Sequence, residues 1–317
     1  MIVDERLDSQ GAQGGKSAQR EKSRAASSSV LAAVGLTGMK LVVGLLTGSL
    51  GILAEASHSG LDLVAAIITW MAVRVSGRPA DEEHLYGHGK VENLSALFET
   101  LLLLATCVWI IHEAIQRLFF RPVHVEATVW AFVVMFISIV VDVSRSRLLY
   151  RTARKYDSQA LEADALHFRT DVWSSAVVIL GLGCVLVADR VPGLAFLHKA
   201  DSLAAVGVAG IVVWISAQLG LRAVRPLLDT APKGLREEII CAVESLPEVI
   251  DCHHVRVRSA GAHVFVDVHV LVDGKQSLEE AHRLTEEIEN VIERVAPRAD
   301  VTVHPEPGCP GPGADRP

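Results

Sequence analysis

The sequence predicts an α-helical membrane protein with six transmembrane helices, followed by a small cytosolic α+β domain. Three observations lead to this prediction. Half of the 317 residues are hydrophobic and the mean hydropathy is positive, which is unusual for a soluble domain of this length. Long apolar segments alternate with short polar ones between Ser28 and Arg222. After Pro226 the pattern changes to that of a soluble domain.

The apolar segments are each close to the roughly 20 residues that a helix needs to cross a bilayer. We predict spans near residues 29–48, 53–74, 94–118, 126–144, 162–188 and 202–222. Basic residues such as Lys22, Arg74 and Lys155 concentrate before the first span and after the second and fourth. Because positive charge favours the cytosolic side, both termini are expected in the cytosol, with the spans in the cytoplasmic membrane.

The N-terminal residues 1–27 are polar and lack the apolar core and cleavage site of a signal peptide. They are predicted to form a disordered cytosolic arm, and residues 28–223 the transmembrane domain. The five cysteines are scattered without a CxxC pair, so neither a disulfide framework nor a zinc ribbon is expected.

Residues 224–307 are predicted to form a cytosolic metal-binding and dimerisation domain in the order α-β-β-α-β, as in ferredoxin-like and metallochaperone-like folds. The helices are expected near 234–246 and 277–295, and the strands near 253–258, 263–272 and 300–304. From Val224 onward the chain has 10 Lys and Arg against 17 Asp and Glu. This acidic balance argues against nucleic acid as a partner and suits cations. Residues 308–317, rich in Pro and Gly, are predicted to be disordered.

Two pairs of ionisable residues lie inside the predicted spans. His58 and Asp62 in span two, and His167 and Asp171 in span five, are each four residues apart, so each pair projects from one face of its helix. Asp62 and His167 each lie 12 residues from a cytosolic basic residue, which at 1.5 Å per residue places both roughly 18 Å from that side. The four side chains can therefore meet at one depth.

Imidazole nitrogen and carboxylate oxygen together suit a tetrahedral divalent cation such as Zn²⁺. Two carboxylates would neutralise the ion's charge, whereas without an ion or protons they are costly to keep in a membrane. The alternative is that each pair only makes interhelical hydrogen bonds. A further carboxylate in span four, Asp142, either lines the cytosolic vestibule or bonds Arg145.

These residues, the loop "DEEHLYGHGKVENL" and the tail closely resemble the cation diffusion facilitator family of divalent-metal/proton antiporters, over residues 30 to 307. In that family two such pairs on spans two and five form the transport site, so the resemblance implies this role for His58, Asp62, His167 and Asp171. The set of two histidines and two aspartates is similar to that of zinc-preferring members, whereas manganese-type members favour a more acidic pattern.

The resemblance implies a second metal site in the cytosolic loop after span two, at Asp81, His84 and His88, whose spacing is also close to that of helical neighbours. The alternative is a solvated polar loop. The family also pairs the lysine at Lys90 with an aspartate after span six, here Asp229. The alternative for Lys90 is an ordinary lysine whose charge reaches the membrane interface.

Five tail residues match the family's regulatory metal positions: His253, His269, His282, His304 and Glu306. Isolated histidines are more often surface residues than ligands, but four at matching positions imply a binuclear zinc site. Five other histidines have no such match and are expected to be structural or interfacial: His254, His263, His112, His124 and His198.

The residues and the resemblance together predict proton-coupled efflux of a divalent metal, first of all Zn²⁺, from the cytosol. Histidine binds metal only when neutral, so protons compete with the ion and can return through the same ligands. The expected partners are the metal ion, protons, the lipid bilayer and a second copy of the chain, which zinc in the tail would draw in.

Several alternatives stay open. Fe²⁺, Co²⁺ and Cd²⁺ accept the same ligand types as Zn²⁺. A membrane-embedded metal sensor would use the tail as its detector, although it needs no complete site at mid-membrane. A metalloenzyme is disfavoured because four protein ligands leave no open position and no HExxH motif is present. A passive channel suits a tight site poorly.

Overall fold

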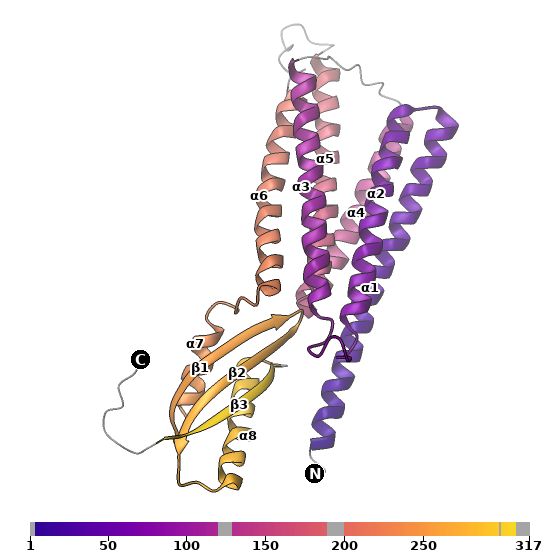
Figure 1. Ribbon diagram of the computed structural model, residues 1–317. Coiled ribbons are helices and arrows are strands. Elements are labelled where there is room, and N and C mark those ends of the chain that lie inside the picture. Colours follow the sequence, from indigo (N-terminus) through magenta and orange to yellow (C-terminus); the bar gives the residue numbers. More distant parts are fainter. Residues whose placement is uncertain (1–3, 120–128, 189–199, 298, 309–317) are drawn as a thin grey trace. The chain divides into compact units, whose positions relative to one another are not determined.

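The computed structural model describes residues 4–119, 129–188, 200–297 and 299–308 (Figure 1). The chain forms two compact units. One comprises Met1–Pro79 and Val91–Val224, and the other comprises Ala80–Lys90 and Arg225–Pro317. The loop of residues 80–90 therefore belongs with the tail domain, and not with the transmembrane domain to which the sequence analysis assigned it.

The first unit contains six long helices among the described residues. They are α1 (Asp4–Thr47), α2 (Leu50–Ser76), α3 (Lys90–Phe119), α4 (Val129–Tyr156), α5 (Gln159–Ala188) and α6 (Ala200–Leu227). Each corresponds to one predicted span, although Gly48 of the first span follows the end of α1 and residues 126–128 of the fourth lie outside the described part. Within that part, three stretches are long and apolar enough to cross a membrane: Ser17–Thr47, Glu55–Ser76 and Lys90–Trp109.

Helix α1 contradicts the prediction of a disordered arm, since it already begins at Asp4. The prediction failed because residues 18–29, within a largely polar segment, carry a helical stripe of small residues and one lysine that packs against the bundle. The members of this stripe are buried: Ala18, Lys22, Ala25, Ala26 and Ser29. Lys22 donates to Glu92 of α3 at 2.7 Å. The ammonium group of Lys22 is therefore paired although it is buried.

Small residues let the six helices approach closely. Helix α1 packs against α2 and α4, α4 packs against α5, and α2 contacts both α4 and α5. One buried cluster joins α1, α2, α4 and α5 around Val73, Leu149, Leu161 and Phe168. A second cluster joins α3, α5 and α6 through Ala96, Ala163, Leu219 and Ala223. Alanine at these positions allows close helix contact in a membrane, where packing and not hydrophobic burial holds helices together.

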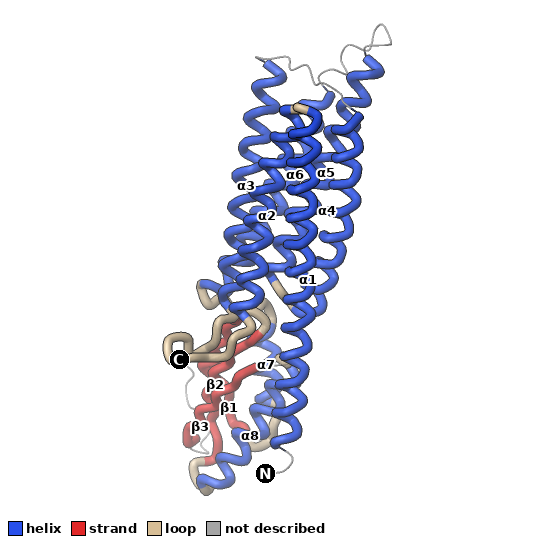
Figure 2. Tube along the Cα trace, turned by 90° about the vertical axis from the view of Figure 1, so that its right-hand side faces the viewer, coloured by secondary structure: helices blue, strands red, loops and turns tan. Residues whose placement is uncertain are grey.

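The tail domain has the predicted order, with α7 (Leu235–Glu244), β1 (Val249–Ala260), β2 (His263–Asp273), α8 (Leu278–Val295) and β3 (Ala299–Gly308) (Figure 2). The strands form one sheet in the order β1-β2-β3. Strand β2 pairs antiparallel with β1 and parallel with β3. Strand β3 continues four residues beyond the predicted end, through Pro305 and Pro307, because an edge strand tolerates residues that cannot donate a hydrogen bond.

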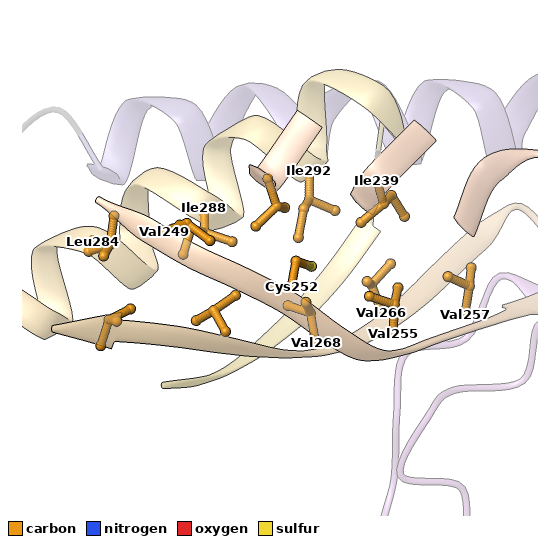
Figure 3. Packing of buried hydrophobic residues seen from close by; sticks show 13 residues of the cluster. Ile239, Val249, Cys252, Val255, Val257, Val266, Val268, Leu284, Ile288 and Ile292 are labelled. Atoms are coloured by element: carbon orange, nitrogen blue, oxygen red, sulfur yellow. The ribbon is translucent and has the colours of Figure 1, made fainter. Parts of the chain in front are cut away.

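One face of the sheet makes the core of the tail domain. Val266, Val268 and Val270 of β2 are fully buried and meet Ile288 of α8 and Ile239 of α7 (Figure 3). The alternate residues of β2, among them His269, lie on the opposite face, because successive side chains of a strand point to opposite sides. The alternation of buried and exposed residues along β2 therefore separates an apolar face of the sheet from a polar one.

The loop of residues 80–90 lies against the tip of the β1–β2 hairpin. The Tyr86 ring packs edge-on against Phe265, with 5.1 Å between centroids, and the Arg258 guanidinium lies 3.8 Å from the Tyr86 centroid. Gly89 approaches Ala260 so closely that a Cβ atom would lie 2.1 Å from the Ala260 carbonyl oxygen. Only glycine fits there, which explains one residue of the YGHGK stretch.

The two described cysteines of the tail domain are expected to react differently with a maleimide. Cys241 is exposed, whereas Cys252 is buried in the core and its burial raises the pKa of its thiol to about 11. Cys252 is therefore protonated at neutral pH and a poor nucleophile. Mass spectrometry of the native protein should show rapid modification of Cys241 and slow modification of Cys252, and denaturation should equalise the two. Equal native rates would contradict the packing of β1.

Candidate metal sites

The four ionisable residues predicted in the membrane lie together in the first unit. Asp62 and His167 are hydrogen-bonded, with His167 Nε2 at 3.1 Å from Asp62 Oδ1. His167 Nε2 also lies 3.6 Å from Asp171 Oδ2, and His58 Nε2 lies 3.9 Å from Asp62 Oδ1 and 4.0 Å from Asp171 Oδ1. Helices α2 and α5 each supply one histidine and one aspartate, and the i, i+4 spacing points both pairs at the shared centre.

These separations fit a tetrahedral ion. With bonds of about 2.0–2.1 Å to nitrogen and oxygen, neighbouring ligand atoms of a tetrahedral Zn²⁺ site lie roughly 3.3 Å apart. The four distances between histidine nitrogens and carboxylate oxygens run from 3.1 to 4.0 Å. Asp62, His167 and Asp171 already meet the spacing of a metal-binding group. His58 lies beside this group of three, with its Nε2 at 3.9 Å from Asp62 Oδ1 and 4.0 Å from Asp171 Oδ1.

Burial differs among the four ligands. The side chain of His167 is 3% exposed, whereas that of His58 is 29% exposed. His58, Asp62 and Asp171 line a cavity of about 70 Å³ that also reaches Lys40 and Glu55. Both of those residues lie toward the end of the bundle where α1 turns into α2. The cavity therefore extends from the ligands toward that end.

The same cavity is lined by Asp142 and Arg145 of α4. Arg145 Nη1 lies 3.4 Å from Asp142 Oδ1, so the predicted bond between these residues is present. Arg145 also donates to Ser29 at 2.9 Å and lies 3.5 Å from the centroid of Phe168. The cavity wall thus carries positive as well as negative groups.

Toward the other end of the bundle the four ligands are covered. Phe168 follows His167 directly and belongs to the apolar cluster with Val73, Leu149 and Leu161. Beyond that cluster, Glu92 accepts from Lys22, Ser76 and Ser158, which joins α3 to α1, to α2 and to the start of α5. This end is closed by packed side chains and by a buried ion pair.

The loop residues Asp81, His84 and His88 also gather. His84 Nδ1 lies 3.2 Å from Asp81 Oδ1, and His88 Nε2 lies 3.2 Å from Asp81 Oδ2. The segment forms a turn, whereas the spacing of these residues in the sequence predicted helical neighbours. The Asp81 carboxylate accepts from the backbone N–H groups of His84 and Glu83. The first of these bonds is the main cause that holds the pKa of Asp81 below its ordinary value.

Three tail histidines form a row across the sheet. His253 of β1 is the register partner of His269 of β2, which is in turn the partner of His304 of β3. Glu306 lies among them: its Oε1 is 2.8 Å from His269 Nδ1 and its Oε2 is 3.4 Å from His253 Nε2. The hydrogen bond from His269 is the main cause that lowers the pKa of Glu306, so its carboxylate is ionised and ready to bind a cation.

His254 joins this group, although the sequence analysis assigned it a structural or interfacial role. A β-bulge interrupts the β1–β2 pairing after His253, and His254 has a φ of +50°. The bulge places two consecutive histidines on the polar face, with Cys252 and Val255 buried on the other. His253, His254 and His269 then meet as one potential metal-binding group, and His269, His304 and Glu306 as another. The adjacent histidines were a signal, but the bulge was not predictable.

His282 does not join the group within one chain. It lies on α8, where its Nε2 is 3.7 Å from Glu286 of the same helix. Helix α8 covers the apolar face of the sheet, whereas the histidine row lies on the other face. His263 begins β2, and His112 is exposed on α3. His124 and His198 lie outside the described residues.

Lys90 and Asp229 form the predicted charge pair. Lys90 Nζ donates to Asp229 Oδ1 at 2.7 Å, and this bond is the main cause that lowers the pKa of Asp229. The pair connects the loop of residues 80–90 to the segment that follows α6, and both partners belong to the tail unit.

Comparison with known families agrees with these sites. The model of the cation efflux transmembrane domain matches residues 27–228, and that of the cation efflux protein cytoplasmic domain matches residues 231–308. The chain belongs to the cation efflux, or cation diffusion facilitator, family. This confirms the resemblance read from the sequence, and cation efflux proteins are transporters and not enzymes.

Relatives of known name cover nearly the whole chain. The cation-efflux pump FieF of Klebsiella pneumoniae is 32% identical over 295 residues, which is 93% of this chain and 95% of that protein. FieF of Yersinia enterocolitica is 33% identical over 289 residues, 90% of this chain and 92% of its own length.

Two solved structures that resemble this chain each cover about a quarter of it. The zinc form of the putative zinc transporter CzrB is 31% identical and covers 24% of this chain and 88% of its own, with a TM-score of 0.23. The metal-bound C-terminal domain of the CzcD transporter from Thermotoga maritima is 35% identical and covers 23% and 86%, with a TM-score of 0.22.

Asp229→Asn is expected to lower the thermal stability of the tail domain slightly at neutral pH. The partners are 39% and 51% exposed, and exposed pairs contribute roughly 0.2–1 kcal/mol. Because folding lowers the pKa of Asp229, the stabilisation is present above the ordinary aspartate pKa and is lost as the pH falls through the lower folded value. Calorimetry in low and high salt should show the difference shrink with salt. A deficit that is independent of salt would contradict an ionic role.

Proposed function

We propose that this protein exports a divalent metal ion, first of all Zn²⁺, from the cytosol through His58, Asp62, His167 and Asp171. The observation that carries the proposal is that the Nε2 atom of each histidine lies 3.1–4.0 Å from a carboxylate oxygen of both aspartates, which is close to the spacing of ligand atoms around one tetrahedral ion. Two carboxylates balance the double charge of the ion, and two imidazoles provide nitrogen ligands that Zn²⁺ accepts readily.

Proton exchange follows from the same ligands. An imidazole must be neutral and a carboxylate ionised to hold the metal, so protonation of the set favours release. In the membrane interior, an unoccupied pair of carboxylates is costly unless it carries protons. Metal and protons therefore alternate at the site, and a proton gradient can drive the ion outward without ATP.

Alternating access is supported by the asymmetry around the site. The cavity reaches Lys40 and Glu55 toward the turn between α1 and α2, whereas the opposite end is covered by the cluster around Phe168 and by the Lys22–Glu92 pair. With both termini in the cytosol of a cell-membrane protein, the open end faces away from the cytosol. Uptake of the cytosolic ion then requires this cluster to separate.

We further propose that the tail and loop groups sense cytosolic metal. Their ligands lie in turns and on an open sheet face, so they exchange ions with solvent directly. His269 is shared by the two tail groups, which suits a binuclear centre. A second copy of the chain would bind through this domain and could contribute its own His282 at the joined surface. Coupling requires the two conformations to differ in metal affinity.

Asp171→Ala is expected to abolish zinc flux, by at least about 100-fold, because it removes a ligand and half of the balancing charge. The measurement is zinc uptake into proteoliposomes that contain a pH-sensitive dye, with a proton gradient imposed. Wild-type protein should show zinc and proton fluxes in opposite directions. His304→Ala should weaken transport without abolishing it, since His304 belongs to the regulatory group.

The matched control is Asp157→Asn, an exposed aspartate between α4 and α5 whose φ of +49° asparagine also accepts. Its flux should equal that of wild type. Absence of flux from wild type, with zinc binding retained, would overturn the transporter proposal and favour a membrane-embedded sensor. Comparison of Zn²⁺ with Fe²⁺, Co²⁺ and Cd²⁺ in the same vesicles measures selectivity.

His269→Ala is expected to reduce zinc binding by the tail more than any other single histidine change, because His269 belongs to both groups. His282→Ala should leave zinc affinity unchanged in dilute monomeric protein. Calorimetric titration of the full chain with Asp171→Ala, which disables the membrane site, isolates the tail and loop. An equal loss in His282→Ala that depends on protein concentration would mean that a second copy supplies this histidine.

A further inference from the structure

A buried carboxylate that none of the proposed sites uses faces the transport ligands from helix α3. The Glu99 side chain is fully buried, and its Oε2 lies 3.5 Å from His167 Nδ1. Neither atom has a hydrogen-bond partner among the described residues. The other carboxylate oxygen, Oε1, accepts from the Thr69 hydroxyl of α2 at 3.0 Å. Burying a carboxylate oxygen without a hydrogen-bond partner costs free energy. The orientation of this oxygen toward a ligand histidine therefore indicates a role there.

We infer that Glu99 is a positioning residue for the metal, which accepts the Nδ1 proton of His167 so that Nε2 faces the transported ion. The inference rests on the proposed function of the transport tetrad, the set of His58, Asp62, His167 and Asp171. Neutral imidazole has one N–H group and one lone pair. His167 Nε2 points at Asp62 and Asp171, so the proton must be on Nδ1 when the ion is bound. Glu99 Oε2 is the acceptor that this N–H group faces.

Only a small movement would bring His167 Nδ1 and Glu99 Oε2 to hydrogen-bonding distance. A distance of 3.5 Å exceeds an ordinary N–H···O bond by a few tenths of an ångström, and movement of the imidazole toward Glu99 would close it. Thr69 holds the other end of the carboxylate, which limits its rotation. Metal-binding histidines commonly donate their second nitrogen to a carboxylate or carbonyl, and this contact fixes the ring and makes it a better ligand.

This role would give α3 a part in a site whose ligands all come from α2 and α5. Thr69 belongs to α2, Glu99 to α3 and His167 to α5, so a single chain of contacts links the three helices at the depth of the ion. Any rearrangement that separates α3 from α5 would release the His167 ring. Metal affinity would then depend on the conformation of the bundle, as alternating access requires.

The test compares Glu99→Leu with Glu99→Gln in proteoliposomes, by measuring the zinc concentration that gives half-maximal flux. Leucine removes the acceptor and should raise that concentration roughly 10–100-fold. The amide oxygen of glutamine can still accept from Nδ1, so Glu99→Gln should recover most of the affinity. Such rescue distinguishes positioning from a requirement for the negative charge.

Thr100→Val is the matched control, since Thr100 is the buried residue next to Glu99 on α3 and its hydroxyl donates to the carbonyl oxygen of Ala96 in the same helix. It should leave the half-maximal concentration unchanged whatever it does to stability. A second assay serves variants that fold but do not transport. It measures zinc binding as a rise in the Tm of the purified full chain, with His269→Ala present to weaken binding by the tail. In this assay Glu99→Leu should weaken zinc binding, and Glu99→Gln should recover most of it.

An affinity within about threefold of wild type in Glu99→Leu, while His167→Ala abolishes binding, would overturn the role of Glu99 and leave the transport site standing. Unchanged binding in both Glu99→Leu and His167→Ala would instead overturn the site itself. A loss of zinc binding that Glu99→Gln shares in full would overturn the role of Glu99 as a hydrogen-bond acceptor for His167.

Discussion

The membrane unit is organised by the need to keep two carboxylates and two imidazoles together in an apolar bundle. A charge buried without a partner would destabilise the bundle by several kcal/mol. In the surrounding helices, small residues let the backbones pack closely, and the buried charged groups are held in pairs. Lys40 donates to Ser59 and lies 3.3 Å from Glu55, Arg145 bonds Ser29 and Asp142, and Lys22 bonds Glu92. The polar groups along the bundle axis thus form a network around the ion site.

The parts of the site that the sequence predicted are those set by local geometry. His58 and Asp62 share a helix face because four residues make about one turn, and this holds whatever the rest of the chain does. Glu99 was not predicted, since its position opposite His167 depends on how α3 packs. The helical start of α1 was missed for a similar reason: its buried stripe consists of three alanines, one serine and one lysine, and only the partner Glu92 makes burial of Lys22 favourable.

The tail shows the same division between local and nonlocal determinants. The strand predicted at residues 263–272 is present as β2, and its buried valines contribute to the core. The gathering of His253, His269 and His304 into one row depends on the register between three strands, which one strand's sequence does not encode. The bulge that turns His254 to the polar face is still harder to predict from the sequence, because it depends on the pairing of β1 with β2. The turn that brings His84 to Asp81 is likewise set by backbone hydrogen bonds and not by helical spacing.

Burial separates the proposed roles of the metal groups. His167 is almost entirely enclosed, so an ion at the tetrad can exchange only when the bundle opens, whereas Asp81, His84 and His304 are exposed and can equilibrate with the surrounding solution. On the proposed function, exchange at the exposed groups is limited by ligand dissociation, and exchange at the enclosed one by a conformational change. The exposed groups can therefore follow the cytosolic metal concentration on a shorter timescale than the transport cycle. A sensor must meet this condition if it is to set the rate of the cycle rather than respond to it.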